Sequence, residues 1–285
     1  ERRSWAEEGA LWGSTGGGPP LEDEDLLYWA CLEGKLEVAK WLRQAEGARW
    51  SGDEGAAAAE AGHLHVLKWL HHQQSPWYGD ESYEAALGGH LHVLRWMSNV
   101  GLLEGDEGSA AAEGGHLHVL EWFHYHLPWD FSGDECTQAA WGGHLHVLQW
   151  LRAHGCPWSE EGQELEMAAD GGHLPVLEWL RGQGREWSAR RPGAEFEAAA
   201  EGGHLPVLQW LHARGCPWGQ YVLERAARGG SLEVLEWLRA AGCAPQGAEL
   251  EAAAEGGHIH VLEWLVDWKE EIEVKEEEAE QEELG

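Results

Sequence analysis

Apolar residues recur along the chain at the spacing of short amphipathic helices. In the stretch 159–184, Leu165, Ala168 and Ala169 lie three and four positions apart, which predicts one short helix. Gly171 and Gly172 favour its end, because glycine adopts the left-handed conformation of a helix C-cap without steric cost. A second apolar face follows, made of Leu174, Val176, Leu177, Trp179 and Leu180. The pattern therefore predicts a helix-turn-helix unit.

The second helix of this unit belongs to a motif that the sequence repeats. Its nine copies begin at Gly34, Gly62, Gly89, Gly115, Gly143, Gly172, Gly203, Gly230 and Gly257. A period of 26 to 31 residues is typical of a solenoid. Each unit is too small to bury its own apolar face, so neighbouring units must stack. We expect an all-α stack of nine repeats over residues 21–268, after a flexible leader at 1–20. An acidic extension at 269–285, partly helical or disordered, should follow.

Tryptophan occurs at one position of the second helix in all nine copies, as Trp150 and Trp179 illustrate. An indole buries ~150–250 Å², and alanine pairs on the first helices would leave room for it. We therefore expect this tryptophan in the core. A second series, which includes Trp158 and Trp187, precedes the first helices and should cover the open edge of each layer.

The motif resembles the ankyrin repeat. Residues 199–211 read Ala-Ala-Glu-Gly-Gly-His-Leu-Pro-Val-Leu-Gln-Trp-Leu, and Gly215-Cys216 closes the unit. The resemblance implies a helix-turn-helix solenoid that binds a protein partner on its concave face. The period here is shorter than the ~33 residues of that family, so we expect tight turns in place of long β-hairpin fingers.

Charge narrows the choice of partner. The net charge is −32, and residues 269–285 contribute nine Glu against two Lys. Nucleic acids and anionic membranes attract clusters of Lys and Arg, so neither is expected as a partner. A protein with a basic segment would be attracted, although the charge can also serve only to keep the chain soluble. We expect a monomer.

The chemistry-bearing residues leave two alternatives open. Eighteen histidines raise the hypothesis of a metal-binding protein, but His63 and His65 are two apart, whereas a helical chelate needs i,i+4 spacing. We expect no metal, no cofactor and no catalysis, because phosphate-loop, nucleophile-elbow and zinc-protease motifs are all missing. The chain can also be the targeting arm of a larger enzyme. Five cysteines without a Cys-x-x-Cys pair favour a reducing compartment, the cytoplasm or the nucleus.

The exposed face of the first helices is the candidate binding surface. Aligning the repeats places aromatic and apolar residues on this face in the first half of the chain, and carboxylates in the second half. The candidates are Tyr28, Leu32, Tyr83, Leu87, Trp141, Glu166, Asp170, Glu197 and Glu201. Exposed aromatic side chains beside acidic ones are typical of a protein-binding surface.

Overall fold

A computed structural model describes residues 23–45, 47–127, 129–159 and 162–284. The leader predicted at residues 1–20 lies outside these ranges. All regular structure in the described ranges is helical, and the helices form nine consecutive pairs, so the prediction of an all-α repeat fold is confirmed. None of the described helices combines the length and the apolar character that crossing a membrane requires.

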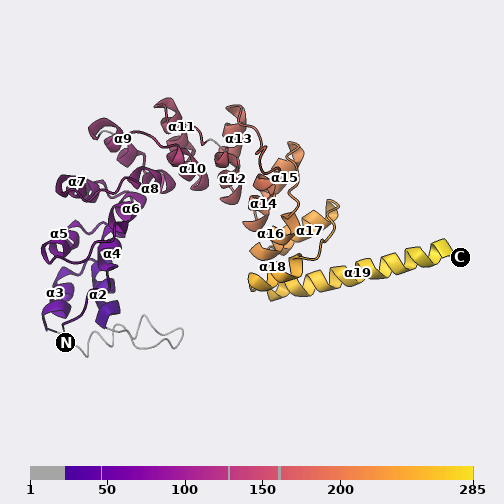
Figure 1. Cartoon of the computed structure of the whole chain (residues 1–285), viewed down its shortest axis with the longest axis horizontal. Coiled ribbons are helices and arrows are strands. Elements are labelled where there is room, and N and C mark those ends of the chain that lie inside the picture. The colour runs from indigo at the N-terminus through magenta and orange to yellow at the C-terminus, as the bar shows by residue number, and fades with distance from the viewer. Residues whose placement is uncertain (1–22, 46, 128, 160–161, 285) are drawn as a thin grey trace. The chain divides into compact units, whose positions relative to one another are not determined.

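The described residues up to Glu104 form a first compact unit, here called the N-terminal unit. Its helices are α2 (Asp23–Leu32), α3 (Leu36–Ala45), α4 (Glu54–Glu60), α5 (Leu64–His72), α6 (Asp80–Leu87) and α7 (Leu91–Val100). Helix α4 packs against both α2 and α6, and each of these first helices also contacts the second helix of its own repeat (Figure 1).

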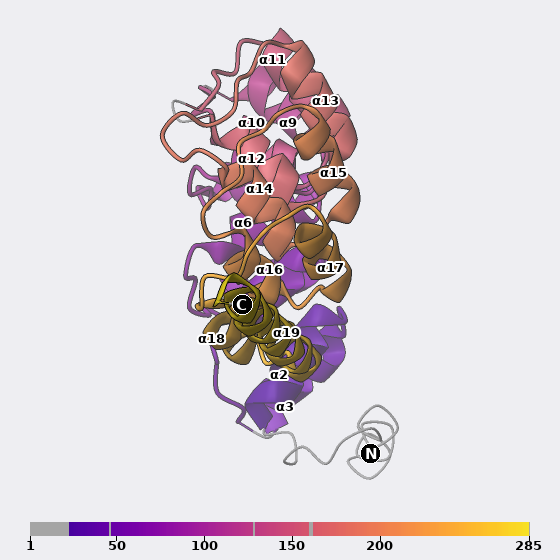
Figure 2. The same ribbon diagram turned by 90° about the vertical axis from the view of Figure 1, so that its right-hand side faces the viewer.

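The described residues from Gly105 onward form the C-terminal unit. Its helices are α8 (Glu107–Glu113), α9 (Leu117–His126), α10 (Asp134–Trp141), α11 (Leu145–Ala153), α12 (Gln163–Asp170), α13 (Leu174–Gly182), α14 (Ala194–Glu201), α15 (Leu205–Ala213), α16 (Val222–Gly229), α17 (Leu232–Ala240), α18 (Glu249–Glu255) and α19 (Ile259–Leu284). The first helices, α8 to α18, stack in sequence order, and the second helices α13, α15 and α17 lie in a row beside them (Figure 2).

Small side chains on the first helix and branched ones on the second make the core. In the repeat of α10 and α11, Ala139, Ala140, Val147, Leu148 and Leu151 are fully buried. Each buried valine or leucine stabilises the fold by about 1.5–3 kcal/mol relative to an exposed one. The alanines let successive first helices approach closely, which explains why the stack runs mainly through them.

The turn between the two helices needs glycine. Gly143 has φ 75°, a conformation that L side chains rarely adopt, and a Cβ at this position would collide with the His173 ring of the next repeat. Glycine therefore recurs at this position of the motif because the backbone conformation of the turn requires it.

The expectation that the second-helix tryptophans lie in the core is wrong. Trp150 and Trp179 are only half-buried, and Trp41 is 40% exposed. Leucine and valine already fill the space that faces the first helix, so the indole lies at the edge of the apolar stripe. There it meets the tryptophan of the segment before the first helix: the ring centroids of Trp158 and Trp179 are 6.0 Å apart.

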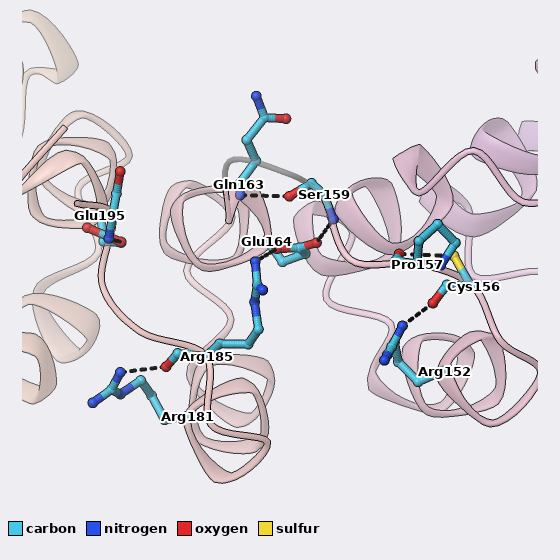
Figure 3. A network of polar contacts seen from close by, with 10 residues as sticks. Arg152, Cys156, Pro157, Ser159, Gln163, Glu164, Arg181, Arg185 and Glu195 are labelled. Atoms are coloured by element: carbon cyan, nitrogen blue, oxygen red, sulfur yellow. Dashed lines mark hydrogen bonds and ion pairs between the residues drawn. The ribbon is translucent and has the colours of Figure 1, made fainter. Parts of the chain in front are cut away.

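Arginine side chains cover these aromatic pairs. The guanidinium carbon of Arg152 lies 4.1 Å from the centroid of the Trp158 ring, and that of Arg181 lies 4.2 Å from Trp187. Each arginine also donates a hydrogen bond to a backbone carbonyl, Arg152 to Cys156 and Arg181 to Arg185 (Figure 3). Cation–π contact and hydrogen bond together hold the connecting segment against the second helix.

Candidate protein-interaction surface

Buried glutamates hold the N-termini of the first helices. They are Glu54, Glu81, Glu107, Glu135, Glu164, Glu195 and Glu249, each at most 3% exposed. The carboxylate of Glu135 shows the contacts: it accepts hydrogen bonds from the backbone N–H of Gly133 at 3.0 Å and from the Ser132 hydroxyl at 3.1 Å. A carboxylate is favourable here, because the N-terminus of a helix is its positive end.

Sequence reasoning missed these glutamates, although a signal was present. Each follows a glycine by two positions, so the motif Gly-x-Glu marks the start of seven first helices. Gly133, with φ 101°, shows why the glycine is needed: it lets the backbone turn back so that its own N–H points at Glu135. In the eighth repeat the position is held by Val222, which is also buried.

Glu164 also forms an ion pair with an arginine. Its side chain is fully buried, one oxygen accepts the Ser159 backbone N–H at 2.6 Å, and the other lies 3.0 Å from the Arg185 guanidinium (Figure 3). The ion pair joins α12 to the segment after α13. It fixes the end of the helix that carries two of the candidate surface residues, Glu166 and Asp170.

Histidines of the motif fasten one repeat to the preceding one. The Nε2 of His90 lies 2.7 Å from the carbonyl oxygen of Glu60, and that of His204 lies 2.7 Å from the carbonyl oxygen of Asp170. A carbonyl only accepts, so Nε2 carries the proton. The second histidine of the motif acts in the same way where His92 reaches the Gly62 carbonyl at 3.0 Å.

These contacts give the histidines a structural role. Burial lowers the pKa of His144 below its usual 6.5, although its hydrogen bond to the Glu113 backbone opposes that shift. Among the described residues, no group of three or more His, Cys, Asp or Glu side chains is arranged to hold a metal ion.

The N-terminal unit carries four of the aromatic and apolar candidates. Tyr28 and Leu32 lie on α2, Tyr83 and Leu87 lie on α6, and all four side chains are half-buried. Trp29, which the sequence alignment omitted, is 49% exposed, and its ring centroid lies 5.7 Å from that of Tyr28. Tyr28 and Trp29 thus form an edge-to-face aromatic pair on α2.

Three carboxylates act electrostatically on Tyr28. Its pKa is raised above the usual 10.0, first by burial and then by neighbouring negative charge. The carboxylates responsible belong to Glu60, Asp53 and Glu84. The N-terminal unit therefore combines an aromatic ring with negative potential, a combination that suits a cationic side chain.

Trp141 and Asp170 are joined in the C-terminal unit. Trp141, at the end of α10, is 41% exposed, and its Nε1 donates a hydrogen bond to Asp170 Oδ2 at 3.0 Å. Asp170 ends the next first helix, α12, so the bond crosses from one repeat to the next. The structure thus brings together two candidates that are 29 positions apart.

Arginines pair with other acidic candidates. Glu166 lies 2.8 Å from the Arg191 guanidinium, and Glu201 lies 2.9 Å from that of Arg225. Each arginine comes from the repeat after its partner. These ion pairs therefore partly neutralise the negative charge predicted for this half of the surface. A comparison of the repeats at one position at a time could not show this, because each arginine belongs to a different repeat from its partner.

Glu197 does not lie on the exposed surface. It is 8% exposed, and its carboxylate accepts a hydrogen bond from the backbone N–H of Tyr221 at 3.1 Å. The eighth repeat lacks a Gly-x-Glu glutamate, and Glu197 of the seventh supplies the acceptor instead. The expectation of an exposed contact residue at this position is wrong for that reason.

Two comparisons with known proteins found similarities. Residues 195–239 match the family model described as ankyrin repeats (many copies). The crystal structure of the human ASB11 ankyrin repeat domain is similar at 20% sequence identity and a TM-score of 0.37, covering 70% of this chain and 90% of that chain. No curated protein shows a significant match to the chain.

Ankyrin repeats generally mediate binding between proteins, and the fold is typically a non-catalytic scaffold. The matched segment, residues 195–239, spans the helices α14 to α17, and the same paired-helix unit recurs through the rest of the described chain. The chain is therefore similar to ankyrin repeat proteins over this segment, and the repeated helix pairs extend the same architecture through the described residues.

Proposed function

We propose that this chain is a non-catalytic scaffold that binds another protein through the exposed face of its first helices. The surface in the C-terminal unit contains Trp141, Asp170, Glu166 and Glu201, and that in the N-terminal unit contains Tyr28, Leu32, Tyr83 and Leu87. Trp29 joins the latter because of its exposure.

The observation that carries this proposal is the restrained exposure of Trp141. Tryptophan is enriched among the residues that dominate binding energy at protein interfaces. A side chain already held in place loses less conformational freedom on binding, which favours affinity. The hydrogen bond to Asp170 supplies that restraint while leaving 41% of Trp141 accessible.

The charges favour a partner with a basic segment. The carboxylates that act on Tyr28 are the strongest support, since those of Glu166 and Glu201 already pair with arginine. A net charge of −32 disfavours nucleic acids and anionic membranes. We further propose that the chain acts as a monomer in the cytoplasm or the nucleus.

Affinity capture with matched variants tests the proposal. Wild type, Trp141→Ala, Tyr83→Ala and the control Trp41→Ala would be immobilised and compared on the same native extract. Trp41 is 40% exposed but lies on a second helix, so its removal deletes an equally exposed indole from a different surface. We expect to find proteins that bind to wild type and to Trp41→Ala but no longer bind to Trp141→Ala or Tyr83→Ala. Equal retention by all four forms would exclude the first-helix surface.

A further inference from the structure

Two buried thiols face each other in the repeat of α10 and α11. Cys136 is the third residue of α10, and Cys156 lies three residues beyond the end of α11. Both residues are fully buried, and their sulfur atoms are 3.1 Å apart. No third atom fits between sulfurs at that distance, so the two thiols are direct neighbours.

The pairing arises from one substitution in the repeat pattern. Cysteine at the position of Cys156 also occurs in two later repeats, as Cys216 and Cys243. The position of Cys136 is held in the later first helices by larger apolar residues, namely Leu165, Phe196, Leu223 and Leu250. A thiol on the first helix therefore meets a thiol after the second helix in this repeat.

We propose that Cys136 and Cys156 form a redox-modification site, at which a hydroperoxide oxidises the two thiols to one intramolecular disulfide. The sulfurs must approach by about 1 Å to reach the ~2.05 Å of a disulfide bond. The cross-link joins residues 20 positions apart and needs no contribution from another chain.

The structure indicates the order of the chemical steps. Cys156 Sγ lies 3.9 Å from Glu135 Oε2, which can accept its proton. The Cys156 thiolate then attacks one oxygen of the hydroperoxide. The O–O bond breaks, the other oxygen leaves as water or alcohol with a proton, and Cys156 becomes a sulfenic acid.

Cys136 completes the reaction. Its hydrogen bond with Cys156, followed by burial, raises its pKa well above the ordinary value, so it remains a thiol until the sulfenic acid forms. Its sulfur then attacks that of Cys156, the S–O bond breaks, and the hydroxyl leaves as water with the Cys136 proton. In the overall reaction, two thiols and one hydroperoxide give one disulfide, one water molecule and the alcohol or water formed from the hydroperoxide. A dithiol reductant converts the disulfide back to the two thiols.

Oxidation would restrain a surface feature. Gly155 and Pro157, on either side of Cys156, line an open hollow of about 450 Å³ together with His124, Phe131 and His154. Linking Cys156 to α10 fixes this rim to the stacked first helices. The disulfide would therefore tie the lining residues Gly155 and Pro157 to α10.

Peptide mapping of the intact chain tests the proposal. The reduced protein is treated with hydrogen peroxide, alkylated, digested without reduction and analysed by mass spectrometry. We expect a peptide pair joined through Cys136 and Cys156 that lacks two hydrogen atoms. Closure of a loop of this length should raise the melting temperature by roughly 5–10 °C.

Cys216→Ala is the matched control. Cys216 is also buried, and its Sγ lies 3.6 Å from the Pro217 carbonyl just as that of Cys156 lies 3.6 Å from the Pro157 carbonyl. The cross-link should persist in this variant and disappear in Cys136→Ala. Wild-type protein whose Cys136 and Cys156 stay unlinked at a peroxide dose that oxidises methionine would overturn the proposal, as would links formed only between chains.

Discussion

The indole nitrogen of Trp141 donates a hydrogen bond to the Asp170 carboxylate across the boundary between two repeats, at 3.0 Å. This bond fixes the orientation of a large, partly exposed aromatic side chain on the first-helix face. The position of the exposed ring therefore depends on the stacking of α10 on α12, and a change in that stacking would alter the surface offered to a partner.

Replacing Asp170 with alanine should release the Trp141 ring with little loss of stability. The bond is exposed, so its removal should cost about 0.5–1.5 kcal/mol of unfolding free energy. The Trp141 indole N–H, assigned by its disappearance in Trp141→Phe, should exchange faster with solvent in an NMR spectrum. An unchanged exchange rate would show that Asp170 does not restrain the ring.

Glu164 and Glu166 are two positions apart on α12 and should differ strongly in their contribution to stability. Glu164→Ala leaves the Ser159 N–H and the Arg185 guanidinium without their partner, and we expect a loss of roughly 2–4 kcal/mol. Glu166→Ala breaks a pair in which Arg191 is 59% exposed, so the loss should stay below about 1 kcal/mol. Urea unfolding of the two variants measures both values. Similar losses would contradict the structural role of the buried glutamate.

As the pH falls, two of the buried glutamates should become protonated at a higher pH in the folded protein than in the unfolded chain. Burial is the main cause that raises the pKa of Glu81 and of Glu195 above the usual 4.5. Between 4.5 and the raised value, the folded state binds more protons than the unfolded state. The contribution of these two groups to the unfolding free energy therefore increases as pH falls through this window and is lost as pH rises through it.

A double variant isolates this pH effect from the rest of the titrating groups. Unfolding free energies of wild type and of Glu81→Gln/Glu195→Gln would be measured from pH 7 to pH 4.5. We expect the wild type to gain stability relative to the variant towards the acidic end. A constant difference across the range would show that neither carboxyl group has a raised pKa.

Arg152 should stabilise its repeat by the shape of the guanidinium as well as by charge. The side chain lies over Trp158 at 4.1 Å and donates to the Cys156 carbonyl. Arg152→Lys keeps the charge but loses the planar stacking, and we expect it to cost about 1 kcal/mol, with Arg152→Ala costing about 2. Thermal or urea unfolding distinguishes the two. Equal stability of the lysine variant and wild type would argue that charge alone matters.

Several features of this protein were predictable from the sequence because they depend on local periodicity. The recurring Gly-His turn, the alanine pairs and the apolar stripe that includes Val147, Leu148 and Leu151 determine nine helix pairs and their stacking. Gly-x-Glu is equally visible in the sequence. The structural role of this motif cannot be recognised from the sequence. A glutamate two positions after a glycine resembles an ordinary solvent-exposed charge, and only the structure shows that the backbone folds around its carboxylate.

Only the tertiary structure decided which side chains share the edges and faces of the stack. Trp150 satisfies the spacing of a core residue, yet Leu148 and Leu151 occupy the interior, and the indole remains at the rim. Likewise, the partners of Trp141 and Cys136 lie 29 and 20 positions away. Helix periodicity specifies the face of a residue within its own repeat, whereas contacts between repeats depend on how closely the alanine-lined first helices approach, and that distance is a property of the assembled stack.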